Sequence, residues 1–121
     1  MSDLKKLGPK GEAFALGMLK KRGDKFIAAN FMCPQGEVDI VSWHKDTLVF
    51  TEVRTRTSDK FGSPAESVTR FKQEKIKRAA NWFVVKNFQG RKLPPCRFDV
   101  IWLIASNDEI LKSGIIEGAF C

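Results

Sequence analysis

The sequence has few cysteines, a single histidine and no long apolar run. Its three cysteines, Cys33, Cys96 and Cys121, lie far apart and form no C-x-x-C pair. Together with the lone His44, this argues against a disulfide framework, a structural zinc site and a histidine-rich metal site. No apolar run reaches the ~18–20 residues of a membrane span, so we expect no membrane partner.

The length and composition indicate one folded domain. A chain of 121 residues has the size of a single domain, which we expect to cover residues 1–121. Apolar residues make up 43% and charged residues 29% of the chain, which excludes a disordered or fibrous protein. The first residues run directly into an amphipathic pattern without the apolar core of a signal peptide. We therefore expect a soluble, cytoplasmic protein.

The charge is strongly positive and unevenly distributed. Lys and Arg number 21 against 14 Asp and Glu, which gives a net charge of +7 and a pI near 9.5. Residues 54–78 hold eight basic and three acidic residues, whereas the segment after Arg97 holds one Lys and four acids. A polyanion suits the first region and not the second, so we expect a nucleic-acid partner.

Helical periodicity occurs twice. Residues 8–22 are expected to form a helix that ends at Gly23. Its predicted core-facing stripe comprises Phe14, Ala15, Leu16, Met18 and Leu19. A second helix is indicated by apolar residues at the spacing i, i+3, i+4, i+7, i+8 from Ile76. Both Ser63 and Thr69 have the character of its N-cap, and the pattern does not choose between them.

Runs of strand-forming residues separate the two helices and follow the second. They are Lys25–Asn30, Glu37–Trp43, Leu48–Arg54 and Phe98–Ile104, with a weaker candidate at Gly114–Phe120. The polar segment 44–47 predicts a hairpin between the second and third strands. The expected order is helix, three strands, helix, one or two strands. We therefore predict an α/β domain with a central mixed β-sheet flanked by helices.

Four acidic residues occupy positions where packing favours apolar side chains. Glu12 lies within the core-facing stripe of the first helix, and Glu52 stands between strand formers. Glu37 and Asp39 share one face of the second strand; we expect a supporting role for Glu37 and not one as a metal ligand. A buried charge costs several kcal/mol unless it is paired or bound to metal.

Two of these acids and a neighbouring cation form a candidate metal site. Glu52 and Arg54 share a face of the third strand, and Asp39 on the adjacent strand can lie beside Glu52. Mg²⁺ binds one or two carboxylates and uses phosphate oxygens and water for its remaining positions. A nearby cation stabilises the charge that develops on a phosphate. The pattern therefore points to a Mg²⁺ phosphodiester site.

Five segments of the chain, in order, resemble the YraN-like uncharacterised protein family. They are Gly11-Glu12, Gly36–Val41, Val49–Arg56, Lys72-Gln73 and Arg97–Val100. That family resembles the archaeal Holliday-junction resolvases of the PD-(D/E)XK, or restriction-endonuclease-like, superfamily. The resemblance implies a restriction-endonuclease-like core and a metal-dependent nuclease that acts on DNA, with branched or structured DNA among its candidate substrates.

The resemblance also assigns expected roles. Asp39 and Glu52 match the two motif acids, and they would hold Mg²⁺ or Mn²⁺ with the Val53 carbonyl. Glu12 matches a helix-one Glu and would bind a second ion or a metal-bound water. Arg54 stands where the motif has Lys; it would contact the phosphate, but it cannot act as a base because it stays protonated.

Two other functions stay open. Arg54 in place of Lys favours a DNA-binding module of nuclease fold with little or no turnover. The second alternative is a scaffold whose basic surface meets an acidic protein. For the nucleic-acid functions, the expected DNA contacts come from the basic segments around the site. They are Arg56, Arg70, Lys72, Gln73, Lys75 and Lys77. The resemblance further implies a homodimer, since resolvase-like enzymes cut two strands. The three tryptophans are expected to be packing residues.

Overall fold

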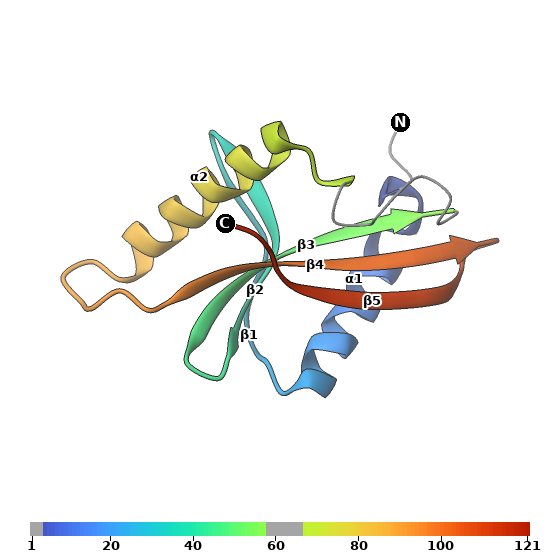
Figure 1. Cartoon of the computed structure of the whole chain (residues 1–121), viewed down its shortest axis with the longest axis horizontal. Coiled ribbons are helices and arrows are strands. Elements are labelled where there is room, and N and C mark those ends of the chain that lie inside the picture. Colours follow the sequence, from blue (N-terminus) through green and yellow to red (C-terminus); the bar gives the residue numbers. More distant parts are fainter. Residues whose placement is uncertain (1–3, 58–66) are drawn as a thin grey trace.

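The computed structural model describes residues 4–57 and 67–121. They form an α/β fold of two helices and a five-stranded sheet, and Figure 1 shows the helices packed against the sheet. In chain order the elements are α1 (Leu4–Arg22), β1 (Lys25–Cys33), β2 (Gly36–His44), β3 (Thr47–Arg56), α2 (Arg70–Asn87), β4 (Cys96–Ser106) and β5 (Glu109–Phe120). This order and the mixed sheet confirm the predicted fold class.

The sheet has the spatial order β1-β2-β3-β4-β5. Three neighbouring pairs are antiparallel, and only β3 and β4 run parallel. A parallel pair cannot be joined by a tight turn and needs a crossover. Here α2 lies within that crossover, so the helix is tied to the strand that carries Glu52 and Arg54. The predicted hairpin joins β2 and β3, with His44 paired to Thr47.

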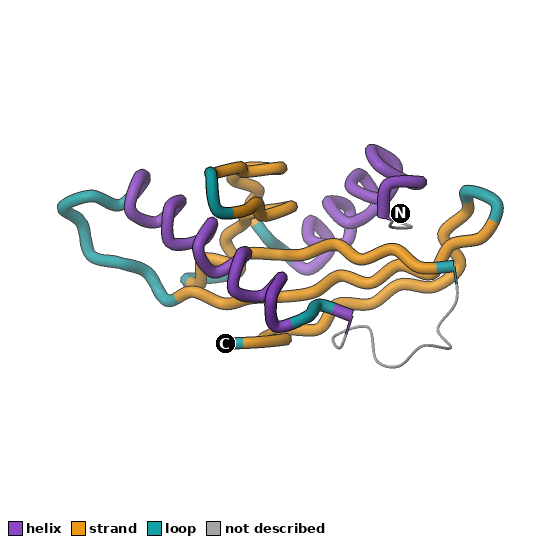
Figure 2. The backbone as a smooth tube through the Cα atoms, turned by 90° about the horizontal axis from the view of Figure 1, so that it is seen from above, coloured by secondary structure: helices purple, strands orange, loops and turns teal. Residues whose placement is uncertain are grey.

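Each helix covers a different face of the sheet, as Figure 2 shows from above. Buried residues of α2, such as Ile76 and Phe83, pack on one cluster that includes Phe50 of β3. Ala15 and Leu19 of α1 pack on a second cluster that includes Ile101 and Leu103 of β4. Because β4 is covered on both sides, its central residues are almost continuously buried, as its unbroken apolar run predicts.

Most element boundaries extend beyond the sequence predictions. The α1 helix begins at Leu4 and contains a kink at Gly8, whose φ of 42° is left-handed. Thr69 is the N-cap of α2 and accepts a hydrogen bond from the Lys72 N–H; the alternative start at Ser63 lies outside the described residues. The predicted core position of Phe14 is wrong, because 40% of this residue is exposed.

The weak strand candidate at the chain end is a full strand, β5, that begins at Glu109. Gly114 lies against the indole of Trp102, so close that a Cβ atom at residue 114 would meet the ring at 2.5 Å. Trp102 is therefore a packing residue, as expected. Trp43 is also one, because its ring meets that of Phe88 edge-on.

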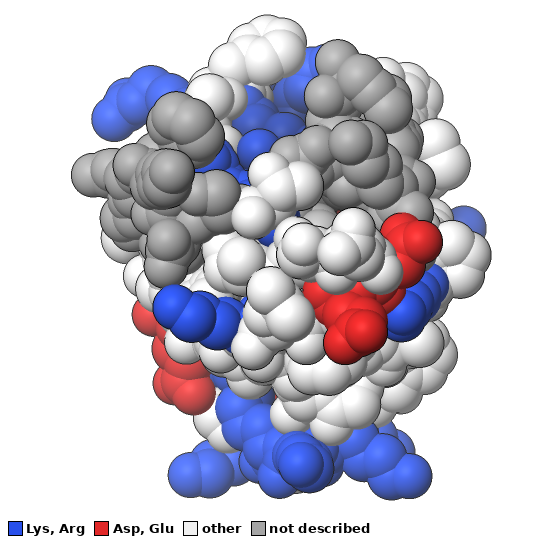
Figure 3. Space-filling model, turned by 90° about the vertical axis from the view of Figure 1, so that its right-hand side faces the viewer, with Lys and Arg blue, Asp and Glu red and all other residues white. Residues whose placement is uncertain are grey.

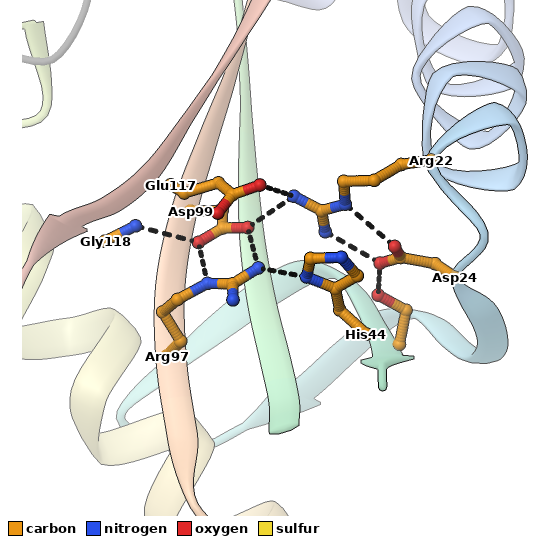
Figure 4. Close-up of polar contacts among 8 residues, drawn as sticks. Arg22, Asp24, His44, Arg97, Asp99, Glu117 and Gly118 are labelled. Atoms are coloured by element: carbon orange, nitrogen blue, oxygen red, sulfur yellow. Dashed lines mark hydrogen bonds and ion pairs between the residues drawn. The ribbon is translucent and has the colours of Figure 1, made fainter. Parts of the chain in front are cut away.

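A buried network of charged side chains ties α1 to β4 and β5 (Figure 4). Asp99 is fully buried and accepts hydrogen bonds from Arg22 and Arg97 at 2.8–2.9 Å, so it is a structural partner of both arginines. The Gly118 N–H donates to the same carboxylate at 3.0 Å. A polar turn position predicts a solvated His44, and this prediction is wrong, because Arg97 contacts Nδ1 of His44 at 2.9 Å.

Candidate metal and phosphate site

The site forms where β2 and β3 separate. The two strands are paired from His44 and Thr47 to Ile40 and Thr51, and the ladder ends there. In an antiparallel pair, Asp39 and Glu52 would be the next partners. Strand separation therefore leaves two carboxylates facing a gap at the same level of the sheet.

The Asp39 side chain bridges this gap with a hydrogen bond that replaces a main-chain hydrogen bond between the strands. Its Oδ2 accepts a hydrogen bond of 2.7 Å from the Val53 N–H. The N–H and C=O of one strand residue point to the same edge, so the Val53 carbonyl faces the gap as well. Asp39, Glu52 and Val53 all line the same cleft. Three oxygen-bearing groups expected at a metal thus lie together.

The two carboxylates repel each other in a partly dry environment. Burial, followed by the negative charge of Glu52, raises the pKa of Asp39 to about 7, although the hydrogen bond from Val53 opposes the rise. Glu52 is only 3% exposed, and its Oε2 accepts no hydrogen bond from any described residue. Buried polar atoms seldom lack a hydrogen bond, and this oxygen has only ion-pair contacts, so it can still accept a metal ion.

Two basic side chains reach the carboxylates from different elements. Lys72, in the first turn of α2, places Nζ 3.3 Å from Glu52 Oε2. Arg54 places Nη1 3.6 Å from the same oxygen, and its Nε donates to Ser67 Oγ at 3.2 Å. Arg54 is 20% exposed and Lys72 39% exposed, so both cations are open to solvent on the cleft side. Such cations can meet the phosphate of a bound substrate.

The cleft has a volume of about 410 Å³, and α1, β1, β2, β3 and α2 all contribute to it. Glu12 lies in its wall, where Oε1 accepts a hydrogen bond of 2.9 Å from Asn30 Nδ2. Glu37 is half-buried and lines the same wall. The four predicted residues Glu12, Asp39, Glu52 and Arg54 are therefore brought to one cleft.

The arrangement fits one divalent cation better than a cluster. No three Asp, Glu, His or Cys side chains lie close enough to hold a metal ion in the part of the chain that the structure describes. Asp39 and Glu52 with the Val53 carbonyl supply two charges and a neutral oxygen, a donor set suited to a hard ion that keeps water. Glu12 lines the cleft without completing a three-acid group.

The remaining predicted DNA contacts fall into two groups. Lys72 reaches the cleft, whereas the Gln73 amide caps its own helix by donating to the Val68 carbonyl at 2.9 Å. Lys75 lies over the Phe71 ring, 4.9 Å from its centre. The other basic members lie at the end of β3 or on α2. They are Arg56, Arg70 and Lys77, the last paired with Glu74 at 3.3 Å.

Two residues of the site lay outside the sequence predictions. Asn30 has a φ of 53° and holds Glu12 in the cleft wall. Asn is one of the residues that tolerate left-handed backbone, so a lone Asn within an apolar strand was the available signal. Ser67 holds Arg54, and no pattern marked it because β3 and Ser67 are joined only by the fold.

A second basic area lies away from the cleft. The last turn of α1 carries Lys20, Lys21 and Arg22. Figure 3 shows a group of basic side chains at the lower end of the molecule, at the height where α1 ends in Figure 1. Arg22 is bound within the buried network, so only the two lysines are exposed there.

Within the described ranges, neither helix has the length and apolar character needed to cross a membrane.

Comparison with known proteins identifies relatives across nearly the whole chain. A UPF0102 protein of Caldicellulosiruptor saccharolyticus is 42% identical over 119 residues, which is 96% of this chain and 98% of the relative. UPF0102 proteins of Geobacter metallireducens and Hahella chejuensis are 46% and 45% identical, covering 80% and 78% of this chain and 78% and 75% of their own. Residues 11–103, which include the whole acidic pair and its cations, match the description "Uncharacterised protein family UPF0102". The chain therefore belongs to the UPF0102 family, the YraN-like family that its motifs resemble.

Proposed function

We propose that this protein is a metal-dependent endonuclease that hydrolyses phosphodiester bonds in DNA, with branched or structured DNA as the favoured substrate. The supporting observation is the Asp39–Glu52 pair, two carboxylates held together in a cleft with two cations beside the buried Glu52 oxygen. The resemblance to the restriction-endonuclease-like superfamily adds to this support. We also propose a cytoplasmic location.

Asp39, Glu52 and the Val53 carbonyl would hold Mg²⁺ or Mn²⁺ in this proposal. The ion would supply a water of lowered pKa and would withdraw charge from the phosphate. The Val53 N–H keeps the Asp39 carboxylate fixed at 2.7 Å, so the metal would meet a preoriented ligand. Glu12, fixed by Asn30, would accept a hydrogen bond from water in the cleft or contact a second ion.

Arg54 and Lys72 would divide the task of the motif lysine between them. Arg54 is held by Ser67, and it would stabilise charge on the phosphate without moving a proton. Lys72 comes from α2 and is already within 3.3 Å of Glu52. When a metal neutralises Glu52, the Lys72 ammonium would be released to contact a phosphate oxygen or to order water.

The experiment is a cleavage assay on linear, flapped and four-way DNAs with Mg²⁺ and with Mn²⁺. The wild type should nick at least one structured DNA, and Asp39→Asn should abolish cleavage while retaining the fold and DNA binding. Asp99→Asn is no suitable control, because it disturbs the core; Glu117→Gln, an exposed acid away from the cleft, should cleave like the wild type. Full activity of Asp39→Asn would refute the site.

The second candidate is a DNA-binding module of nuclease fold with little turnover. The observation that favours it is the Lys72–Glu52 ion pair, since an ammonium at 3.3 Å can neutralise the buried acid without a metal. Both candidates predict steep weakening of DNA binding with salt, because bound cations release counterions from the phosphates. A flat salt dependence would favour instead a scaffold that meets an acidic protein. Absence of nicking with every DNA and both metals, combined with steep salt dependence, would select the module.

A homodimer is also proposed, because two sites would cut two strands of a branched DNA. Sedimentation of the purified protein with and without a four-way DNA would test it. Two protein copies per DNA would support the dimer, whereas one copy per DNA would contradict it.

A further inference from the structure

The exposed face of α2 carries two basic side chains with an aromatic side chain at either end. Phe71, Lys75, Arg78 and Trp82 follow one another at spacings of four, three and four residues, which places them on one side of the helix. Phe71 is 71% exposed and Trp82 46% exposed. We refer to these four residues as the α2 stripe. At 1.5 Å per residue it is about 16 Å long.

Trp82 differs in this respect from the other two tryptophans. Trp43 packs against Phe88 and Trp102 against Gly114, whereas the Trp82 ring lines a surface hollow of about 320 Å³. The expectation that Trp82 is a packing residue is therefore wrong. A large aromatic ring left open to solvent between cations is unusual on a surface that only needs to be soluble.

The stripe continues into the cleft. A second hollow, of about 370 Å³, is lined by Phe71 and Lys75 of α2 together with Lys72 and Glu37. The last two also line the proposed metal cleft. The hollow beside the stripe and the proposed metal cleft are therefore neighbours that share two lining residues.

The turn between β1 and β2 forms the other wall of these hollows. Gly36 lies so close to α2 that a Cβ atom there would come within 2.7 Å of the Lys75 carbonyl. Figure 1 shows this turn beside α2. Gln35 contributes to both hollows, next to Phe71 in one and to Trp82 in the other. Gly36 therefore lets the β1–β2 turn approach α2 closely, and this turn lines both hollows.

The charges on this surface favour an anion. Lys75 is positioned over the Phe71 ring, so a cation and a stacking surface lie next to each other. Arg78 forms no ion pair with any described residue. Glu74 is the nearby acid on α2, and Lys77 neutralises it at 3.3 Å. Cations placed next to exposed rings suit single-stranded nucleic acid, whose bases stack while its phosphates are neutralised.

We propose that the α2 stripe binds a single-stranded segment of DNA that leads into the cleft. The inference deepens the proposed function and rests on it in taking DNA as the partner. A duplex keeps its bases stacked inside, so it could use only the cations of the stripe. An unpaired flap or arm could use the rings as well. The stripe would therefore select DNA that has an unpaired segment next to the duplex.

The test measures equilibrium binding in EDTA, so that cleavage plays no part. Fluorescently labelled probes of equal phosphate number are a blunt duplex, a flapped duplex, a single-stranded oligonucleotide and an abasic oligomer that lacks bases. The wild type should bind the single-stranded oligonucleotide more tightly than the abasic oligomer. Phe71→Ala and Trp82→Ala should each weaken binding of the flapped and single-stranded probes by about five- to 150-fold, with little effect on the blunt duplex or the abasic oligomer.

Phe26→Ala is the matched control. This phenylalanine is 56% exposed and lines a groove beside α1, on the other face of the sheet, so its removal should change no affinity. Trp82 fluorescence should also be quenched by the single-stranded oligonucleotide and not by the abasic oligomer, with the Trp82→Phe variant as the reference. Retained folding of each variant is checked by circular dichroism.

Three results would overturn the inference. The first is equal affinity of the wild type for the single-stranded and abasic probes. The second is an equal loss of affinity for all probes in the alanine variants. The third is unchanged DNA affinity of the alanine variants with a loss of self-association, which would make the stripe a protein interface. Failure of cleavage with every metal would refute the proposed function without altering this binding comparison. Loss of the single-strand preference alone would refute the inference and leave the nuclease proposal standing.

Discussion

In the described part of the chain, the Asp24–Asp99 pair and the Asp39–Glu52 pair are held in opposite ways. Asp24 and Asp99 receive hydrogen bonds from Arg22, Arg97 and other donors (Figure 4). Burial alone would raise the pKa of both carboxyls, but the Arg hydrogen bonds outweigh it and lower both values. At Asp39, burial and the charge of its neighbouring acid prevail, and the pKa rises to about 7.

The opposite pKa shifts separate acids whose ionised form is stabilised by the fold from an acid whose ionised form is destabilised by it. A buried carboxylate with fixed Arg partners needs nothing further, so the Asp24–Asp99 network has no use for a ligand. A carboxylate facing another carboxylate is in its best state when a cation joins them. The contrast therefore identifies a functional site by electrostatics, independently of any motif.

The largest effect is expected from removing an acid of the satisfied network. Asp99→Ala should lower the free energy of unfolding by about 3–5 kcal/mol, because Arg22 and Arg97 would lose their buried partner. Urea denaturation followed by circular dichroism measures this. Glu117→Ala, which removes a 53% exposed acid 3.5 Å from Arg22, should cost less than about 1 kcal/mol. Equal losses of stability in the two variants would show that the buried acid contributes no more than the exposed one.

The next effect concerns Arg54 at the unsatisfied pair. If the protein cleaves DNA, Arg54→Ala should lower the cleavage rate by about 10²-fold or more, the usual scale for losing one group that stabilises transition-state charge. Arg54→Lys should preserve or raise the rate, because lysine keeps the charge and can order water. Single-turnover cleavage of the preferred DNA measures both. A Lys variant as slow as the Ala variant would contradict a purely electrostatic role.

A smaller effect follows from the pKa of Asp39 in metal-free protein. Because this pKa is raised in the folded state, the stability that Asp39 contributes is present below its unfolded pKa of ~3.9 and is lost as the pH rises through about 7. Asp39→Asn removes this dependence. It should therefore raise the free energy of unfolding, relative to wild type, on the order of 1–2 kcal/mol more at pH 8 than at pH 5.

Urea denaturation in EDTA at the two pH values tests this prediction. For Asp99 in the buried network, the pH dependence of stability should have the opposite sign. The lowered pKa of Asp99 means that its stabilisation is present above ~4 and is lost as the pH falls below that value. A variant difference at Asp39 that is the same at pH 5 and pH 8 would show that its carboxyl is not perturbed.

The smallest effect is expected from surface charge beside the two acid pairs. The double reversal Lys75→Glu and Lys77→Glu, near the cleft, should weaken DNA binding by about tenfold for every sequence and flatten its salt dependence. Glu117→Lys, near the buried network, should leave affinity unchanged or slightly improve it. Fluorescence anisotropy over a range of salt concentrations measures both. Equal losses at the two places would contradict a localised phosphate-binding surface.

The sequence predicted much of the fold because local patterns determine its elements. Apolar periodicity located both helices, and strand-forming runs located β1 to β4 to within a few residues. Charged residues in strand interiors also marked Asp39 and Glu52, since few structures place acids there without a reason. The ends of elements were less predictable, because Gly8 and the length of β5 depend on tertiary packing.

The site was only partly predictable, for a related reason. Strand alternation brings Glu52 and Arg54 to one face, but the separation of β2 and β3 that exposes Asp39 is not encoded in any local spacing. The same holds for Ser67, which meets Arg54 only after the chain has folded. The predictions for Phe14 and His44 were wrong because neither periodicity nor turn position reveals what lies opposite a side chain.

The single parallel pair in the sheet also governs the order in which the site can assemble. Strands β1 to β3, and β4 with β5, are joined by short turns, whereas β3 meets β4 across a segment that includes α2. Contacts between residues distant in sequence form slowly, because a long loop must first be closed. The two carboxylates thus belong to the early, local part of the sheet, and Lys72 arrives with the late crossover. Until α2 docks, the acidic pair therefore has Arg54 of its own strand as its cationic partner, and Lys72 joins it with the crossover.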